Sequence, residues 1–139
     1  MLQIIEVTDS EGRIVASRWL GPAEHVHRQL RPQLMPNYSD QMLRVFAGGG
    51  RMLVAVDDGQ VLGLCVWRYL EKTFSRSELY IDDLVADAGH RSAGVGKALL
   101  AWCACALPLA GGEHRAALAH AFDVGSVLLF AIDLNLRRG

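Results

Sequence analysis

The sequence predicts one mixed α/β domain of the α+β type, with a mostly antiparallel central sheet flanked by helices. Three observations indicate this fold class. Helical spacing occupies the first third of the chain, three β-branched runs separated by turn signals occupy the middle, and a glycine-rich turn then leads into a long apolar segment. At 139 residues, the chain has the length of one domain with one core. We therefore expect a single domain over residues 1–139.

The first third of the chain is expected to form a strand and two helices. Its helical spacing is broken at Gly21-Pro22, and Asn37 begins a segment that can cap the second helix. In order, the predicted elements are a strand at Gln3–Val7, a helical region at Ile14–Leu34 that ends around Arg31-Pro32, and a helix at Gln41–Ala47.

The middle of the chain predicts three antiparallel strands. Asp57-Asp58-Gly59 is a hairpin turn signal, and Gly63 is a candidate position for a β-bulge. The three strands are expected at Arg51–Val56, Val61–Leu70 and Glu78–Val85.

The last third predicts a helix and then a strand. The helix is expected at Gly94–Ala106 and the strand at His114–Phe122, whereas the apolar segment Val124–Leu136 is ambiguous between helix and strand. The chain ends soon after this segment, so it lacks room for a further closing strand.

The most informative motif is the turn between the third middle strand and the following helix, where Arg91, Gly94 and Gly96 follow an apolar run in the order Arg-x-x-Gly-x-Gly. Small residues let main-chain N–H groups approach an anion closely, and a helix N-terminus adds about half a positive charge there. This arrangement suits a pyrophosphate.

Two common glycine motifs do not match this turn. The dinucleotide fingerprint requires a third glycine where the chain has Leu99. The nucleotide P-loop requires Ser or Thr after Gly-Lys, where the chain has Ala98, and a glycine where it has Arg91. These mismatches argue against a nucleotide-binding protein.

The segments Asp82-Asp83-Leu84-Val85-Ala86-Asp87 and His90–Leu100 together resemble the GNAT family of acyl-CoA-dependent N-acetyltransferases, most specifically over residues 50–107. The resemblance implies a GNAT-like sheet domain and acetyl-CoA as co-substrate, with no metal. It also implies that the pantetheine pairs with the strand backbone and that the pyrophosphate lies on the amides of the turn. The residues implied in cofactor binding are Leu84, Val85, Ala86, Arg91, Ser92, Ala93, Gly94, Val95, Gly96 and Lys97.

The resemblance also implies transfer of an acetyl group directly to a primary amine of a small molecule or peptide. A carboxylate, directly or through water, then takes the ammonium proton. The candidates are Asp83 and Asp82, on the strand before the turn. Because side chains alternate across a strand, we expect these two to face opposite sides, so that at most one points into the cleft.

One family feature is missing from the sequence. Members commonly carry a tyrosine that protonates the leaving thiolate, but the corresponding segment here is Gly125-Ser-Val-Leu-Leu-Phe130, and no tyrosine follows Tyr80. Either water or Tyr80 replaces that acid, or the transfer needs none, or the chain is a catalytically inactive acyl-CoA-binding or regulatory module on the same fold.

Composition favours a reducing cytoplasm and few macromolecular partners. A net charge of −1 gives no general attraction to nucleic acid or to an anionic membrane, and no segment reaches the length of an apolar membrane span. Three cysteines follow no disulfide framework. The C-terminal segments are apolar nearly all round, which predicts a homodimer formed through them.

The histidines give little signal. His25 and His27 lie two apart, a spacing that cannot hold one metal ion on a helix, and both are expected on the surface. In folds of this kind, Trp19, His27 and Tyr38 occupy a region that can line an acceptor pocket, but we expect each of them to serve packing in the core or at the surface.

Overall fold

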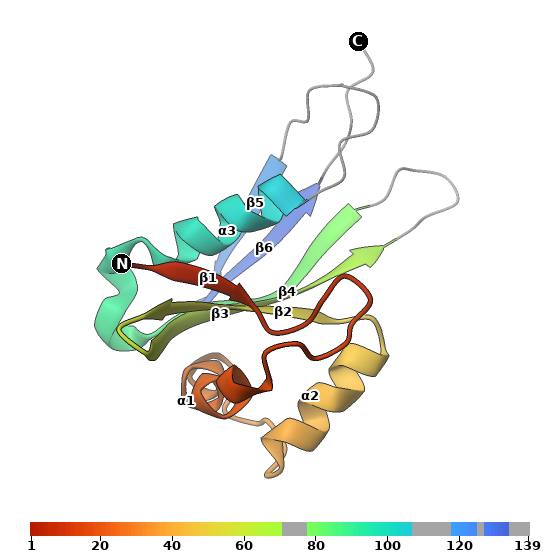
Figure 1. Cartoon of the computed structure of the whole chain (residues 1–139). Helices are drawn as coiled ribbons and strands as arrows, with labels where there is room; N and C mark the ends of the chain where they lie inside the picture. Colours follow the sequence, from red (N-terminus) through yellow and green to blue (C-terminus); the bar gives the residue numbers. More distant parts are fainter. Residues whose placement is uncertain (71–77, 107–117, 125–126, 134–139) are drawn as a thin grey trace.

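The computed structural model describes residues 1–70, 78–106, 118–124 and 127–133. Figure 1 shows three layers, with α1 and α2 on one face of a central sheet and α3 on the other face. In chain order, the elements are β1 Gln3–Glu6, η1 Ser17–Trp19, α1 Leu20–Leu30, α2 Tyr38–Ala47, β2 Arg51–Asp57, β3 Gln60–Leu70, β4 Glu78–Ala86, η2 Ala88–Ala93, α3 Val95–Ala106, β5 Leu118–Val124 and β6 Val127–Asp133.

The sheet has six described strands in the order β1-β2-β3-β4-β6-β5, and every neighbouring pair is antiparallel. This confirms the predicted fold class. The C-terminal segment that was ambiguous between helix and strand forms β6, which lies between β4 and β5. The start of the strand predicted at His114–Phe122 lies outside the described residues, and its described part belongs to β5.

The first helix differs from the prediction at Gly21-Pro22, which lies inside the first turn of α1 and does not interrupt it. Proline is tolerated there because the N–H groups of the first turn have no intrahelical acceptor, so none is lost. The second helix begins at Tyr38, three residues before the predicted start at Gln41, because Asn37 caps it. The side chain of Asn37 accepts a hydrogen bond from the N–H of Asp40 at 3.1 Å.

The hairpin between β2 and β3 turns at Asp58 and Gly59, as predicted. Both residues have positive φ, 51° and 74°. Two successive positive φ values are typical of a two-residue turn whose twist matches that of the flanking strands.

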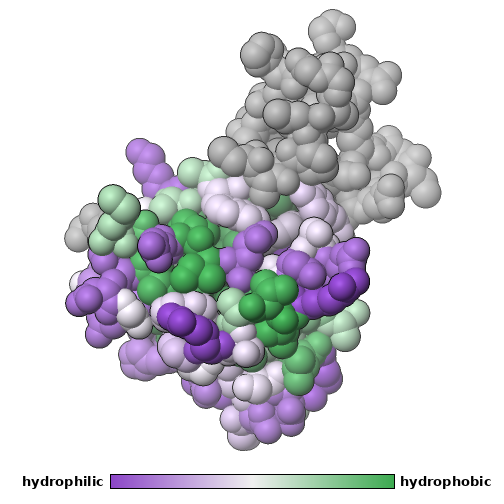
Figure 2. All heavy atoms as spheres, viewed as in Figure 1, coloured by the Kyte–Doolittle hydropathy of each residue, from purple (hydrophilic) through white to green (hydrophobic). Residues whose placement is uncertain are grey.

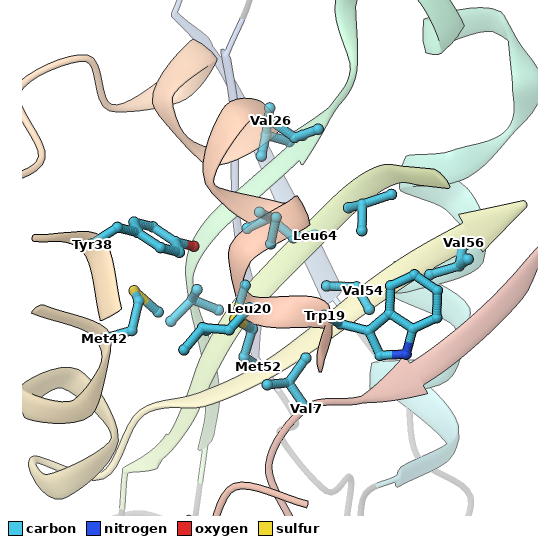
Figure 3. Close-up of a cluster of buried hydrophobic side chains, with 14 of the residues drawn as sticks. Val7, Trp19, Leu20, Val26, Tyr38, Met42, Met52, Val54, Val56 and Leu64 are labelled. Carbon is cyan, nitrogen blue, oxygen red and sulfur yellow. The ribbon is translucent and has the colours of Figure 1, made fainter. Parts of the chain in front are cut away.

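The core lies on both faces of the sheet, because successive strand residues point to opposite sides. Met52 and Val54 of β2 face α1 and α2, whereas Leu53 and Ala55 face α3. Figure 3 shows the first face, where Tyr38 from α2 points its hydroxyl toward α1.

A β-bulge next to Gly63 confirms the predicted irregularity in β3. Ala55 pairs with Gly63 and Val56 pairs with Val61, so one residue of β3 is left over. A Cβ on Gly63 would lie 2.4 Å from Cγ1 of Val95 and 2.8 Å from the carbonyl oxygen of Val85. The missing side chain therefore lets the first turn of α3 pack directly on the sheet.

The described surface in the orientation of Figure 1 is a mosaic of hydrophilic residues and separate hydrophobic patches, as Figure 2 shows. None of the helices in the described ranges combines the length and apolar character needed to cross a bilayer.

Candidate functional site

A bulge in β4 brings Asp82 and Asp83 to the same face of the sheet. Val66 pairs with Asp83 and Trp67 pairs with Ile81, so Asp82 is the extra residue. The expectation that Asp82 and Asp83 face opposite sides is therefore wrong. Side chains normally alternate between the two faces of a strand, but the extra residue at the bulge interrupts this alternation within β4.

Asp83 is held by the side chains of His27 in α1 and of Arg31, the residue that follows this helix. One carboxylate oxygen lies 2.7 Å from Nε2 of His27, and the other forms an ion pair with Arg31 at 2.7 Å. Both Asp83 and His27 are largely excluded from solvent, with side-chain exposures of 13% and 2%. The predicted surface position of His27 is therefore wrong, whereas His25 is exposed.

Tyr38 extends this network. Its hydroxyl lies 2.7 Å from Nδ1 of His27. An ionised Asp83 only accepts hydrogen bonds, so Nε2 of His27 carries a proton and donates it to that carboxylate. Burial, with the nearby carboxylates of Glu24 and Asp83, raises the pKa of Tyr38. Tyr38 therefore remains a neutral hydroxyl.

Asp82 has its own cation. Nη2 of Arg68 lies 2.6 Å from Oδ2 of Asp82, and Nε of the same guanidinium donates to that oxygen at 2.7 Å. Both side chains are a little over a quarter exposed. The two aspartates thus carry separate ion pairs, one to the neighbouring strand β3 and one to the residue that follows α1.

These residues line a cavity of about 260 Å³ between α1, α2 and the sheet. The lining of the cavity combines charged and polar side chains with apolar ones. Its lining in the described residues comprises His27, Arg31, Gln33, Leu34, Gln41, Met42, Val45, Val66, Arg68, Asp82 and Asp83.

Acid should weaken this network. Burial alone would raise the pKa of Asp83, but the hydrogen bonds and charges of His27 and Arg31 outweigh burial and lower it below 3.8. The unfolded chain then binds the proton more readily, so the stabilisation is complete above pH 3.8 and disappears as pH falls through the folded-state pKa. We expect the free energy of unfolding to fall below that pH, and Asp83→Asn to make the fall shallower in acid-dependent denaturant titrations. Identical slopes would contradict this expectation.

The glycine turn lies at the end of β4, where η2 leads into α3. Gly94 has φ of 75°, a left-handed conformation that favours glycine, and a Cβ on Gly96 would meet no atom within 4 Å. The N–H groups of the first turn of α3 have no intrahelical acceptor. An anion would therefore meet bare main-chain donors next to open space, as a pyrophosphate requires.

Hydrogen bonds of the Gln29 side chain join this turn to α1. The amide of Gln29 donates to the carboxylate of Asp87 at 2.7 Å, and its carbonyl oxygen accepts from the N–H of Ala88 at 2.9 Å. His90 lies 2.8 Å from the same carboxylate, and the hydrogen bonds from Gln29 and His90 lower the pKa of Asp87. Helix α1 therefore contacts both the cavity and the turn.

The strand residues predicted to meet the cofactor lie on β4. Leu84 and Val85 are buried on opposite faces, and Ala86 is half-buried. In the described ranges, β4 pairs with β6 only at Leu79 and Tyr80. The backbone on that side of residues 84–86 therefore has no ladder partner among the described strands, and its amide and carbonyl groups remain available to a ligand.

The remaining predicted cofactor residues occupy the turn. Val95 is fully buried against Gly63, so its side chain belongs to the core and only its main chain faces the turn. Lys97 is exposed. The backbone of Arg91, Ser92 and Ala93 forms the end of η2, and their side chains lie outside the described residues. Ser126 also lies outside them.

The sequence analysis missed the roles of Arg31, Gln29 and Arg68. Arg31 follows His27 at i+4, directly after the last residue of α1, and contacts Asp83. Gln29 lies two residues after His27, on another side of the helix, and contacts Asp87. Helical spacing predicted only that these residues lie in one helical region. The contacts across 52 to 58 residues of sequence depend on how α1 lies on the sheet.

The fold and the site define a mixed α/β domain with a glycine-rich turn at the start of α3 and a carboxylate-lined cavity. The Acetyltransferase (GNAT) family model matches residues 16–131, and the chain belongs to that family. No curated protein matches the chain at the significance required.

Solved structures share the fold at low sequence identity. An aminoglycoside acetyltransferase from an uncultured soil metagenomic sample, in complex with sisomicin, has a TM-score of 0.59 and 17% identity, covering 75% of this chain and 68% of its own. The ribosomal-protein-alanine N-acetyltransferase of Brucella melitensis has a TM-score of 0.60 and 16% identity, covering 76% and 70%. A protein assigned to the GNAT family from Desulfovibrio desulfuricans has a TM-score of 0.57 and 13% identity, covering 96% and 99%.

Proposed function

We propose that the chain uses acetyl-CoA to acetylate a primary amine of a small molecule or peptide by direct transfer. The observation that carries this proposal is the placement of two carboxylates, Asp82 and Asp83, in one cavity on the strand that leads into the glycine turn. The turn would hold the diphosphate on the amides of residues 91–97, and the backbone of residues 84–86 would pair with the pantetheine.

The cavity supports the chemistry of the acceptor. An acceptor amine arrives as an ammonium ion, which the carboxylates attract, and must lose a proton before it attacks the thioester carbonyl. In the transfer, the new C–N bond forms and the C–S bond breaks, so the thiolate leaves and takes up a proton. Asp82 or Asp83, directly or through water, accepts the ammonium proton.

Release of free thiol from acetyl-CoA in the presence of an amine panel tests this function. We expect turnover that requires both acetyl-CoA and an amine. Acetyl-CoA binding without turnover of any amine would refute the enzymatic proposal, and an absence of binding would refute the cofactor site as well. Calorimetric titration of the protein with CoA separates these two outcomes.

The glycine turn gives a sharper test. Replacing Gly94 by valine places a β-branched residue at φ of 75° next to the proposed diphosphate. We expect at least about a tenfold loss of CoA affinity in calorimetry, because several charge-assisted main-chain hydrogen bonds lose their geometry.

The matched control is Gly59→Val in the β2–β3 hairpin. Gly59 has φ of 74° and, like Gly94, has no atom within 4 Å of a built Cβ. Both variants should lose similar stability, but only the change at Gly94 should weaken CoA binding. Unchanged affinity in Gly94→Val would require the cofactor site to be abandoned.

The missing tyrosine favours a second candidate function, a catalytically inactive acyl-CoA-binding or regulatory module. No tyrosine follows Tyr80, and Tyr80 itself is on β4 with an exposed side chain. In an active enzyme, water or Tyr80 would protonate the thiolate, or the transfer would need no such acid. Tight CoA binding without thiol release would favour the inactive module.

We also propose a cytoplasmic homodimer that contacts through the C-terminal segments and binds neither nucleic acid nor membrane. The apolar composition of β6 and the near-zero net charge support these proposals. The mass measured by light scattering at micromolar concentration tests the dimer, and a monomeric mass would count against it.

A further inference from the structure

The charges that line the cavity balance. Among the described lining residues, Asp82 and Asp83 carry two negative charges, and Arg31 and Arg68 carry two positive charges. Each aspartate is paired with one arginine, at 2.6 Å for Asp82 and 2.7 Å for Asp83. A polycationic acceptor would gain little from such a lining, because each added ammonium group would meet a guanidinium as well as a carboxylate. The balance instead favours an acceptor that carries one positive and one negative group.

The volume of the cavity limits the size of the acceptor. Its volume of about 260 Å³ lies below the roughly 300–1,000 Å³ that encloses a drug-sized ligand. The space therefore suits a molecule of amino-acid size, or a similarly small part of a larger one.

Arg31 retains hydrogen-bonding capacity toward the cavity. Its Nε and Nη2 donate to Asp83, and Nη2 also reaches the carbonyl oxygen of Asp82 at 3.3 Å. Within the described ranges, no group accepts from Nη1 of Arg31, and about a third of the side chain is exposed. By contrast, Nη1 of Arg68 donates to the carbonyl oxygen of Gly48 at 3.3 Å. Arg31 is therefore the guanidinium of the two whose Nη1 has no acceptor among the described residues, so both of its N–H groups can bind an anionic ligand.

We propose that the acceptor is a free α-amino acid, whose ammonium group is held by Asp82 and Asp83 and whose carboxylate is bound by Nη1 of Arg31. A single guanidinium contacts Asp83 and would also contact the ligand carboxylate, so the two charged groups of the ligand must lie close together. An α-amino acid meets this requirement, since one carbon atom separates its amine from its carboxylate. A peptide N-terminus carries an uncharged amide at that position.

Because this inference rests on the proposed function, its test compares substrates as well as variants. Thiol release is measured with an α-amino acid, its carboxamide and the amine that lacks the carboxyl group, using side chains of several sizes. We expect kcat/KM for the acid to exceed that for the carboxamide by about tenfold to a hundredfold, which is the range expected for a hydrogen bond between charged groups. Arg31→Gln should abolish this preference.

The comparison between substrates isolates the proposed contact. Arg31→Gln also disturbs Asp83, but that effect reduces the rate for the acid and the carboxamide alike, whereas loss of the carboxylate contact affects the acid alone. Arg13→Gln is the matched control, because Arg13 is an exposed arginine paired with Glu11 outside the cavity. This control should retain the wild-type preference.

Binding provides a readout that does not depend on turnover. Calorimetry of the CoA-loaded protein should detect the α-amino acid more strongly than its carboxamide, and Arg31→Gln should remove the difference. Turnover of amines without a carboxylate, or of peptides, with no preference for the acid would overturn this inference and leave the proposed function intact. Failure of every amine would refute the proposed function, and equal binding of acid and carboxamide would then overturn this inference separately.

Discussion

Replacing Asp83 by asparagine is expected to lower kcat for amine acetylation by about a hundredfold or more, the usual contribution of a positioned proton acceptor. Asparagine keeps the shape of the side chain, and its oxygen can still accept from Arg31. Its amide can donate to His27 if the imidazole adopts its other tautomer and donates to Tyr38. The fold should therefore survive with a loss of about 2 kcal/mol from weaker hydrogen bonds. Steady-state thiol release and thermal unfolding measure the two effects.

Two further variants make this result specific. Asp82→Asn changes the other carboxylate of the cavity, and the larger loss in kcat identifies which aspartate accepts the proton. Asp58→Asn is the matched control, because Asp58 is exposed in the hairpin turn and asparagine tolerates its φ of 51°. A wild-type rate in Asp83→Asn would remove Asp83 from the catalytic candidates.

Replacing Gly63 by alanine is expected to destabilise the domain by about 1–3 kcal/mol, the usual range for an overpacked core. The new Cβ would lie 2.4 Å from Cγ1 of Val95 and 2.8 Å from the carbonyl oxygen of Val85. The oxygen belongs to the backbone of β4, so relieving both contacts requires α3 to move away from the sheet and β3 to shift relative to β4. CoA affinity should fall in the same variant, since the amides of the proposed diphosphate site belong to the first turn of α3.

A second substitution tests whether the contact with Val95 causes the loss of stability in Gly63→Ala. Val95→Ala removes one of the two clashing groups, so the double variant should be more stable than the sum of the single changes predicts. Gly96→Ala is the contrasting variant, because its Cβ would enter open space in the first turn of α3. It should retain or slightly increase stability. Additive effects at Gly63 and Val95 would show that packing between them does not limit the fold.

The elements with strong local signals agree between sequence and structure. Asn37 caps α2, Asp58 and Gly59 form the hairpin turn, and the strand before the glycine turn leads into α3 as expected. Each of these features depends on backbone preferences and hydrogen bonds within a few residues. The failure at Gly21-Pro22 has a similarly local cause, because a proline within the first helical turn removes no hydrogen bond.

By itself, the sequence determined the fold class, the position of the glycine-rich turn and the presence of two adjacent carboxylates before it. Only the tertiary structure decided that Asp82 and Asp83 share one face, that His27 is buried against Asp83, and that Arg31 reaches the same cavity. The physical reason is the range of the interactions involved. A β-bulge depends on the pairing between β3 and β4, and the network around Asp83 depends on how α1 packs across the sheet, so neither leaves a periodic signal in the chain.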